Sequence, residues 1–212
     1  RDLHSFPTRR SSDLDLYSLP KVTLNLTLFN SDGRRMFLTE TVEVDAEGRM
    51  QLGYRLAPAG SYRTLPRLGI QLGLDSKCSQ VQWWGNAIET YPDRQTATWT
   101  GCHTQPTDKA CGELHVVPQE SGNRSAHWVT FTLGDKRLSF CSATEKPLNF
   151  SLRQYDDSVM YRARRIKDLQ PTDHYVVNID TRQAGLGTAT CGPGVDKRYT
   201  ISADSVQRFR FT

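Results

Sequence analysis

The residues best suited to chemistry lie in one glycine-rich stretch, YVVNIDTRQAGLGTATCGPG at 175–194. A strand-like run followed by glycines is one mark of a phosphate-binding loop. Such a loop needs a Lys-Ser or Lys-Thr pair and a helix that begins behind its glycines. Here Pro193 and Gly194 follow, and the next residues alternate as in a strand. The pattern therefore argues against phosphate binding.

Cys191, in the same stretch, carries a side chain that can act as a nucleophile. A cysteine nucleophile needs a neighbouring base that lowers the pKa of its thiol. The available bases are His103, His115, His127 and His174, and nothing in their spacing brings one of them to Cys191. We expect these histidines to be structural or exposed, and we do not expect cysteine catalysis.

A glycosidase would instead need two carboxylates, which lie about 5 Å apart in retaining enzymes. Acidic residues are spread over the expected strands and loops. Nothing in the sequence selects one pair among Glu89, Asp93, Glu113, Glu120 and Asp180. Composition and spacing alone therefore predict no catalytic pair in this chain.

The chain has five cysteines, and no two of them have the spacing of a zinc ribbon or a redox pair. Cys102 and Cys111 have His103 and His115 nearby in sequence, but these four residues match no common set of metal ligands. We therefore expect no metal site in this chain. An odd number of cysteines gives weak support for a reducing compartment.

Charge and hydropathy argue against two classes of partner. The formal net charge is +4 at pH 7, and the one basic cluster, YRARRIK at 161–167, is typical of a solvated helix face. The mean hydropathy is −0.58. No run approaches the roughly 18 apolar residues of a membrane span. We expect neither nucleic acid nor a membrane as a partner.

Short alternating runs dominate the sequence. In KVTLNLTLFN at 21–30, we expect Val22, Leu24, Leu26 and Leu28 to share one face of a half-buried strand and the polar residues between them to share the other. Such runs recur between turns, which predicts an all-β fold, a large antiparallel β-sandwich. The other runs expected as strands are MFLTETVEVD, MQLGYRL, VQWW, GELHVV, HWVTFTL, RLSFCSA, LNFSLRQY, HYVVNI and RYTISA.

One segment departs from this pattern. Asp157 and Ser158 form a helix cap, good helix formers follow, and Pro171 is a stop signal. We therefore predict one short helix from about Val159 to Leu169.

The first residues, RDLHSFPTRRSSDL at 1–14, lack the apolar core of a secretory signal. They coincide at every position with one reading frame of a widely used sequencing adaptor. We therefore expect residues 1–14 to be an adaptor-derived artefact, and residues 15–212 to be a fragment of a longer protein.

Four motifs in order carry a family resemblance: LPRLGIQL at 65–72, WWGNAIETYPDR at 83–94, VVPQESGNRSAHWVTF at 116–131 and NIDTRQAGLGTATCGPG at 178–194. Together they resemble the C-terminal small-chain domain of β-galactosidases of glycoside hydrolase family 2. The resemblance begins near Val22 and covers nearly all of the chain. It implies a supersandwich similar to that of galactose mutarotase, truncated at its N-terminal side.

The resemblance also implies a place within a larger enzyme. Members are five-domain enzymes that hydrolyse terminal β-D-galactosides such as lactose with retention, using two glutamates of an upstream barrel. Their Mg and Na ions also belong to upstream domains. We expect this domain to pack against the barrel and sandwich domains of a homo-oligomeric parent, and the isolated chain to be inactive. The location stays open, with the cytoplasm favoured over the periplasm.

In this family the glycine-rich loop reaches over the barrel mouth. An aromatic residue that stacks on the sugar precedes a small residue and a proline. Here Cys191 has that position, before Gly192 and Pro193, and we expect Thr190 to line the same site. A thiol has no π-face, so a stacking contribution of about 1 kcal/mol is lost or replaced.

Two other motifs supply weaker candidates. From PQESGNR, we expect Glu120, Asn123 and Arg124 either to contact substrate or to be structural. A second group is expected to form a structural network more than a substrate contact: Glu89, Tyr91, Asp93 and Arg94.

Two alternative functions remain open. One is a stand-alone carbohydrate-binding β-sandwich, which would have measurable sugar affinity without upstream sequence. The other is a mutarotase-like sugar epimerase, which needs two histidines and a carboxylate on one concave sheet face.

Overall fold

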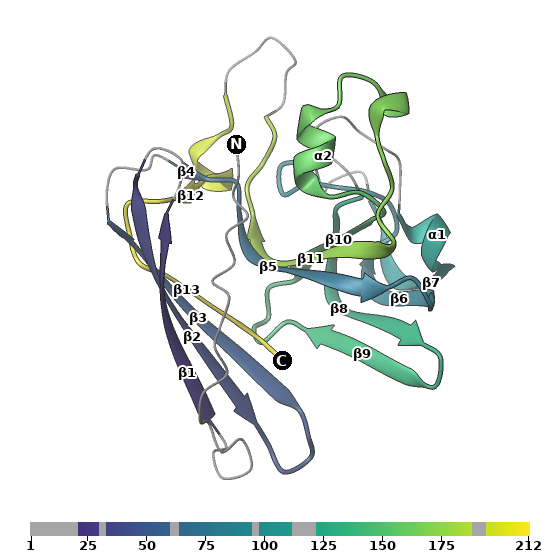
Figure 1. Ribbon diagram of the computed structural model, residues 1–212, viewed down its shortest axis with the longest axis horizontal. Coiled ribbons are helices and arrows are strands. Elements are labelled where there is room, and N and C mark those ends of the chain that lie inside the picture. The colour runs from purple at the N-terminus through teal and green to yellow at the C-terminus, as the bar shows by residue number, and fades with distance from the viewer. Residues whose placement is uncertain (1–20, 30–32, 60–63, 95–97, 112–121, 188–193) are drawn as a thin grey trace. The chain divides into compact units, whose positions relative to one another are not determined.

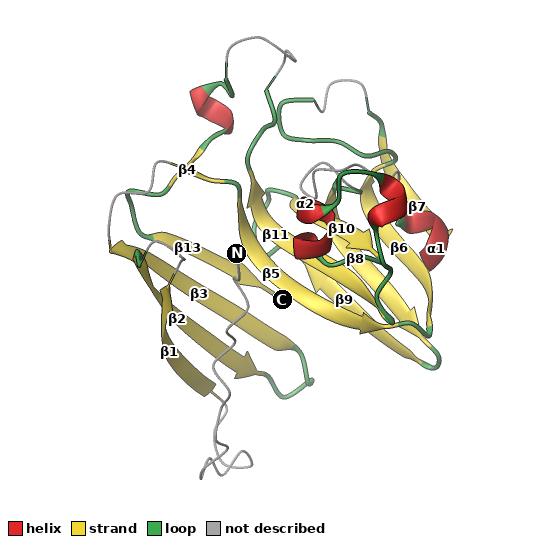
Figure 2. Ribbon diagram, turned by 45° about the horizontal axis from the view of Figure 1, so that its top comes forward, coloured by secondary structure: helices red, strands yellow, loops and turns green. Residues whose placement is uncertain are grey.

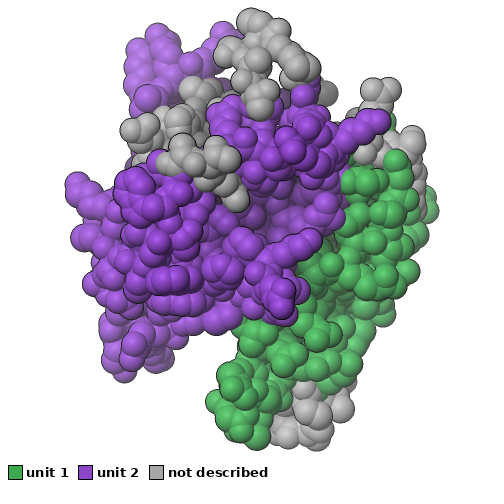
Figure 3. Space-filling view, turned by 180° about the vertical axis from the view of Figure 1, so that it is seen from behind, with its two compact units in different colours: residues 1–64, 202–212 green, residues 65–201 purple. Residues whose placement is uncertain are grey.

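The described part of the chain forms two compact units, coloured separately in Figure 3. One unit comprises residues 1–64 and 202–212, and the other comprises residues 65–201. The computed structural model describes residues 21–29, 33–59, 64–94, 98–111, 122–187 and 194–212 (Figure 1).

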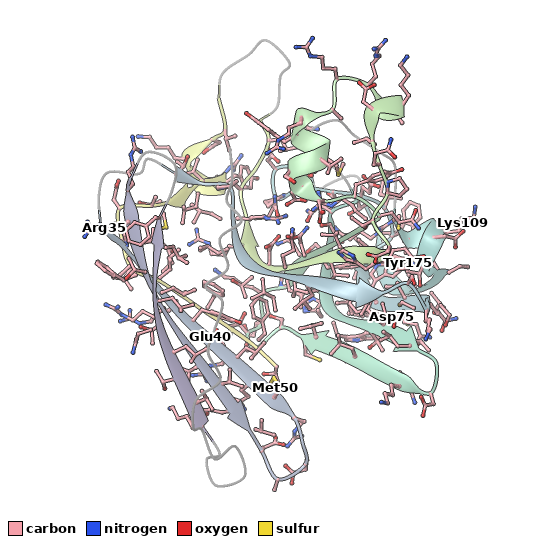
Figure 4. All side chains as sticks on the ribbon, viewed as in Figure 1. Arg35, Glu40, Met50, Asp75, Lys109 and Tyr175 are labelled. Carbon is pink, nitrogen blue, oxygen red and sulfur yellow. The ribbon has the colours of Figure 1, made fainter. Side chains whose placement is uncertain are left out.

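The first unit is a four-stranded antiparallel sheet in the order β1-β2-β3-β13. The predicted alternation of β1 is confirmed as far as Leu26, because Val22, Leu24 and Leu26 are half-buried and the residues between them are exposed. It is wrong for Leu28, which is 40% exposed near the end of the strand. Tyr54 donates a hydrogen bond of 2.9 Å to Glu40, which is labelled in Figure 4. The strands are β1 Lys21–Phe29, β2 Arg35–Val44, β3 Met50–Ala59 and β13 Gln207–Phe211.

The second unit contains a seven-stranded antiparallel sheet in the order β5-β11-β10-β8-β6-β7, with β9 paired to β8 (Figure 2). Its strands are β5 Arg67–Asp75, β6 Cys78–Asn86, β7 Thr100–Pro106, β8 Arg124–Leu133, β9 Lys136–Cys141, β10 Leu148–Arg153 and β11 His174–Gln183. Where the chain passes between the units, β4 Thr64–Leu65 pairs with β12 Ile201–Ser202.

Much of the apolar core of the second unit lies on one face of this sheet. Residues directly opposite each other on neighbouring strands point to the same face of a sheet. Trp83 of β6 is opposite Val129 of β8, and Val129 is opposite Phe140 of β9, so the three side chains share one face. All three are buried. The Trp83 indole donates a 2.9 Å hydrogen bond to the carbonyl of Asn86, which satisfies its buried N–H.

The antiparallel all-β class predicted from the alternation is confirmed, but the helices differ from those expected. The single helix expected at 159–169 is instead α2, Asp157–Arg162, followed by a 3₁₀ turn, Ile166–Asp168. The α-helix ends early because the chain becomes extended at Ala163 and Arg165. There the Asp168 carboxylate accepts a hydrogen bond from the Arg165 backbone N–H, which competes with helical bonding.

Other elements were not anticipated by the sequence patterns. A short helix, α1 Thr107–Ala110, follows β7. A 3₁₀ turn, Lys197–Tyr199, takes the first two residues of the strand expected at RYTISA, of which Ile201–Ser202 form β12. The strand expected at GELHVV lies outside the described residues. Among the described helices, none is long and apolar enough to cross a membrane.

Candidate functional site: the stem of the glycine-rich loop

The glycine-rich stretch leaves the sheet at the end of β11. Residues 184–187, here named the loop stem, are described, and residues 188–193 lie outside the described residues. The predicted substrate-binding residues Thr190, Cys191, Gly192 and Pro193 are therefore outside the described part of the chain, as is Glu120. What the structure does show is how the loop stem is held.

The carboxylate of Asp93 binds the backbone of the loop stem. Its two oxygens accept hydrogen bonds from the N–H groups of Leu186, at 3.3 Å, and Gly187, at 2.8 Å. A Cβ atom on Gly185 would lie 2.7 Å from this carboxylate, so a larger residue could not occupy that position without displacement. Hydrogen bonds to an ionised acceptor are stronger than neutral ones. The carboxylate therefore fixes the stem backbone.

Arg94 completes this contact from the neighbouring position. Its guanidinium donates a hydrogen bond of 2.9 Å to the carbonyl of Gly187. Gly187 has a φ of 96°, a conformation that side chains of L-residues disfavour. Both polar backbone groups of Gly187 are thus bound by the side chains of Asp93 and Arg94, which confirms the structural role expected for these two residues.

The turn that carries these side chains, residues 90–94, is itself held by Asn123. The Thr90 N–H donates to the Asn123 carbonyl at 2.8 Å, and the Asn123 side-chain amide donates to the Thr90 carbonyl at 2.7 Å. Both residues are buried. The described contacts of Asn123 are therefore those of a structural bridge between the segments that follow β6 and precede β8.

Arg124 lies in the core of the second unit. Its guanidinium is 5.2 Å from the centre of the Trp83 ring and donates a hydrogen bond of 2.9 Å to the Ala110 carbonyl. Burial lowers the pKa of Arg124, and the nearby carboxylate of Glu89 opposes this shift. A cationic group that lies over the face of an indole ring is attracted by the ring quadrupole, which is a cation–π interaction. These contacts favour the structural alternative for Arg124.

The histidines do not converge within the described part of the chain. His103 lies on β7 and His174 on β11, with three strands of the sheet between them. His127 is exposed on β8, and His174 is paired with Asp173 at 2.8 Å. The epimerase alternative therefore lacks a histidine pair among these residues, and His115 lies outside them.

Comparison with known proteins gives the family. The family model described as β-galactosidase small chain matches residues 8–212. This chain belongs to the β-galactosidase small-chain family. A β-galactosidase of Staphylococcus xylosus is 28% identical over 79% of this chain and 17% of its own length. Those of Photobacterium profundum and Arthrobacter sp. (strain B7) are 27% and 30% identical over 89% and 71% of this chain, and over 18% and 15% of their own lengths. The chain thus spans less than a fifth of these relatives.

A second polar cluster in this small-chain domain joins α2 to the sheet. The Asp157 carboxylate is 3.1 Å from Arg67 of β5 and 3.1 Å from Arg153 of β10. Arg67 also donates to the side-chain oxygen of Asn178 on β11. Burial raises the pKa of Asp180 to about 7, although the charges of Arg67 and Arg153 oppose the shift. This cluster was not predicted from the sequence.

Proposed function

We propose that this chain is the C-terminal part of a β-galactosidase, and that its loop at 188–193 completes the galactoside site of that enzyme. Its family membership supports this, together with relatives that are named β-galactosidases and are at least five times as long as the matched region. The two catalytic glutamates would then belong to the upstream part.

The loop stem is the observation that carries this proposal. A loop that lines a site built on another domain must present its residues in a fixed position, because a misplacement of about 1 Å can cost about a hundredfold in rate. Asp93 and Arg94 bind three backbone groups immediately before residue 188. This arrangement is the one such a loop needs.

The role that we assign to this chain is substrate binding. In the retaining reaction, one upstream carboxyl group protonates the glycosidic oxygen while the other attacks the anomeric carbon. We assign Cys191, with Thr190, Gly192 and Pro193 beside it, to contact with the sugar or its aglycone. No bond-breaking step is assigned to residues of this chain.

The Mg and Na ions expected in the parent enzyme do not fit the described residues. Among these, no three side chains of His, Cys, Asp or Glu come together as ligands. The resemblance places both ions in upstream domains, and we derive no step through them. The other expected partners are the upstream barrel and sandwich domains and further copies of the enzyme.

The test is Cys191→Trp in the full-length enzyme, with Cys191→Ser as the matched control. An indole at this position should lower the KM for lactose several-fold by supplying a stacking face, whereas the serine variant should not. Unchanged kinetics in the tryptophan variant would refute the role of the loop. Hydrolysis of a galactoside by the purified 212-residue chain would contradict the assignment of catalysis to the upstream part.

A further inference from the structure

Two tryptophans lie in one row across the strands of the second unit. Trp84 of β6 is directly opposite Cys102 of β7 on one side and Trp128 of β8 on the other, and Trp128 is opposite Cys141 of β9. Directly opposite residues share a face of the sheet. The row therefore runs across four strands as Cys102, Trp84, Trp128 and Cys141.

This row is on the open face of those strands. Trp83, one residue earlier, is completely buried on the core face, whereas Trp84 is 43% exposed. Trp128 is half-buried, and both cysteines are exposed. Two indoles on neighbouring strands thus have surface on the same accessible face, where a ligand can pack against both.

The next row along the same face is polar but uncharged. Gln82 is opposite Thr104 and Thr130, and Thr130 is opposite Ser139. Gln82 donates to Thr104 at 3.3 Å, and the hydroxyls of Thr130 and Ser139 are 2.8 Å apart. These interactions hold the amide and hydroxyl groups in place. We name this surface the tryptophan face, defined by Trp84, Trp128, Gln82, Thr104, Thr130 and Ser139.

The ring faces of both indoles are free of other described aromatic rings. Within the described part of the chain, the ring pairs join Tyr54, Phe209 and Phe211, or place Trp83 against His103 or Phe150. Neither Trp84 nor Trp128 takes part in them. The two indoles are therefore not stacked on each other.

We infer that the tryptophan face binds neutral oligosaccharides. A pyranose ring offers an apolar C–H face that packs on an indole and hydroxyl groups that pair with amides and hydroxyls, and this surface supplies both kinds of partner in adjacent rows. A nucleic acid or an acidic polymer would require a cluster of cations, whereas these two rows have none and the following row has one, Arg137. Protein hot spots are poor in Ser and Thr, which surround the indoles here. This inference rests on the proposed function, because an enzyme that acts on galactosides would meet galactose-containing oligosaccharides.

The test is affinity electrophoresis of the purified chain through gels that contain soluble β-1,4-galactan, with anionic polygalacturonate as the second polymer. We expect galactan to retard the chain and polygalacturonate not to do so. Trp84→Ala and Trp128→Ala should each weaken retardation by about tenfold, which is the size of one aromatic stack. Tyr161→Ala is the matched control, because Tyr161 is an exposed aromatic residue on α2, away from these rows.

A second measurement uses the unsubstituted chain and so does not depend on whether the variants fold. Cys102 and Cys141 flank the two indoles, so bound galactan should slow their alkylation by a maleimide, read for each thiol by peptide mapping. Absence of galactan retardation, or equal retardation of the tryptophan variants and the unsubstituted chain, would overturn the inference. Neither result bears on the loop at 188–193, which is tested by the kinetics of the full-length Cys191 variants.

Discussion

The bond between Asp93 and the loop stem can be tested by Asp93→Asn. The substitution keeps one carboxyl-type oxygen and replaces the other with an amide donor, which then faces a backbone N–H of Leu186 or Gly187. A hydrogen bond to a charged group contributes about 1.5–3 kcal/mol. Because Asp93 is half-buried, we expect a loss of about 2 kcal/mol in the free energy of unfolding of the second unit.

Urea unfolding followed by tryptophan fluorescence measures this loss selectively. All four tryptophans of the chain lie within residues 65–201, so the signal reports the second unit. Asp135→Asn, in the exposed turn between β8 and β9, is the matched control for the change in charge. If Asp93→Asn and Asp135→Asn have free energies of unfolding within about 0.5 kcal/mol of each other, the stabilising role of the Asp93 carboxylate is wrong.

Three further changes test other parts of the domain. Gly185→Ala should destabilise the second unit by about 1–3 kcal/mol in urea, because its Cβ would lie 2.7 Å from the Asp93 carboxylate, and an unchanged midpoint would contradict this close approach. Burial raises the pKa of Asp180 from 3.8 to about 7, so the folded state retains a proton that the unfolded state releases. Stability should therefore fall as the pH rises between these values, and Asp180→Asn should remove that slope in urea titrations at several pH values. Arg124→Met should cost about 3 kcal/mol in thermal unfolding, because the buried carbonyl of Ala110 loses its donor and the indole of Trp83 loses its cation.

The alternating pattern predicted β1 to β3 of the first unit, but it did not predict β13, and it predicted the second unit less well. β1 to β3 have clean alternation and short turns, and they form the hairpins expected. β5 was missed because Gly69 and Gly73 interrupt its apolar run, and glycine weakens the signal of a strand. The structure gives a tertiary reason for Gly69, since the Asp180 side chain lies where its Cβ would be. β7 was missed because the run at 100–106 is polar and ends in proline.

The candidate site was predictable only in part. The sequence indicated that Asp93 and Arg94 belong to a structural network, but it could not name their partners, because Gly187 lies 94 and 93 positions further along the chain, respectively. The second polar cluster, which joins α2 to the sheet, does have a pattern in the local sequence that indicates it. Asn178 and Asp180 occupy alternate positions of a run otherwise rich in Val and Ile, so both polar side chains share one face of a buried strand.

The loop stem gives the glycines a physical role other than phosphate binding. Gly185 is required by the close approach of the Asp93 carboxylate, and Gly187 by a backbone conformation with a φ of 96°. These are two different constraints, and both glycines contact the turn at 90–94, which is more than 90 positions earlier in the sequence. Because the N–H and the carbonyl of Gly187 are both bound, the backbone direction entering residue 188 is fixed before the loop begins. A substitution such as Cys191→Trp can then report on substrate contact alone, since the stem that carries the loop does not need to reorganise.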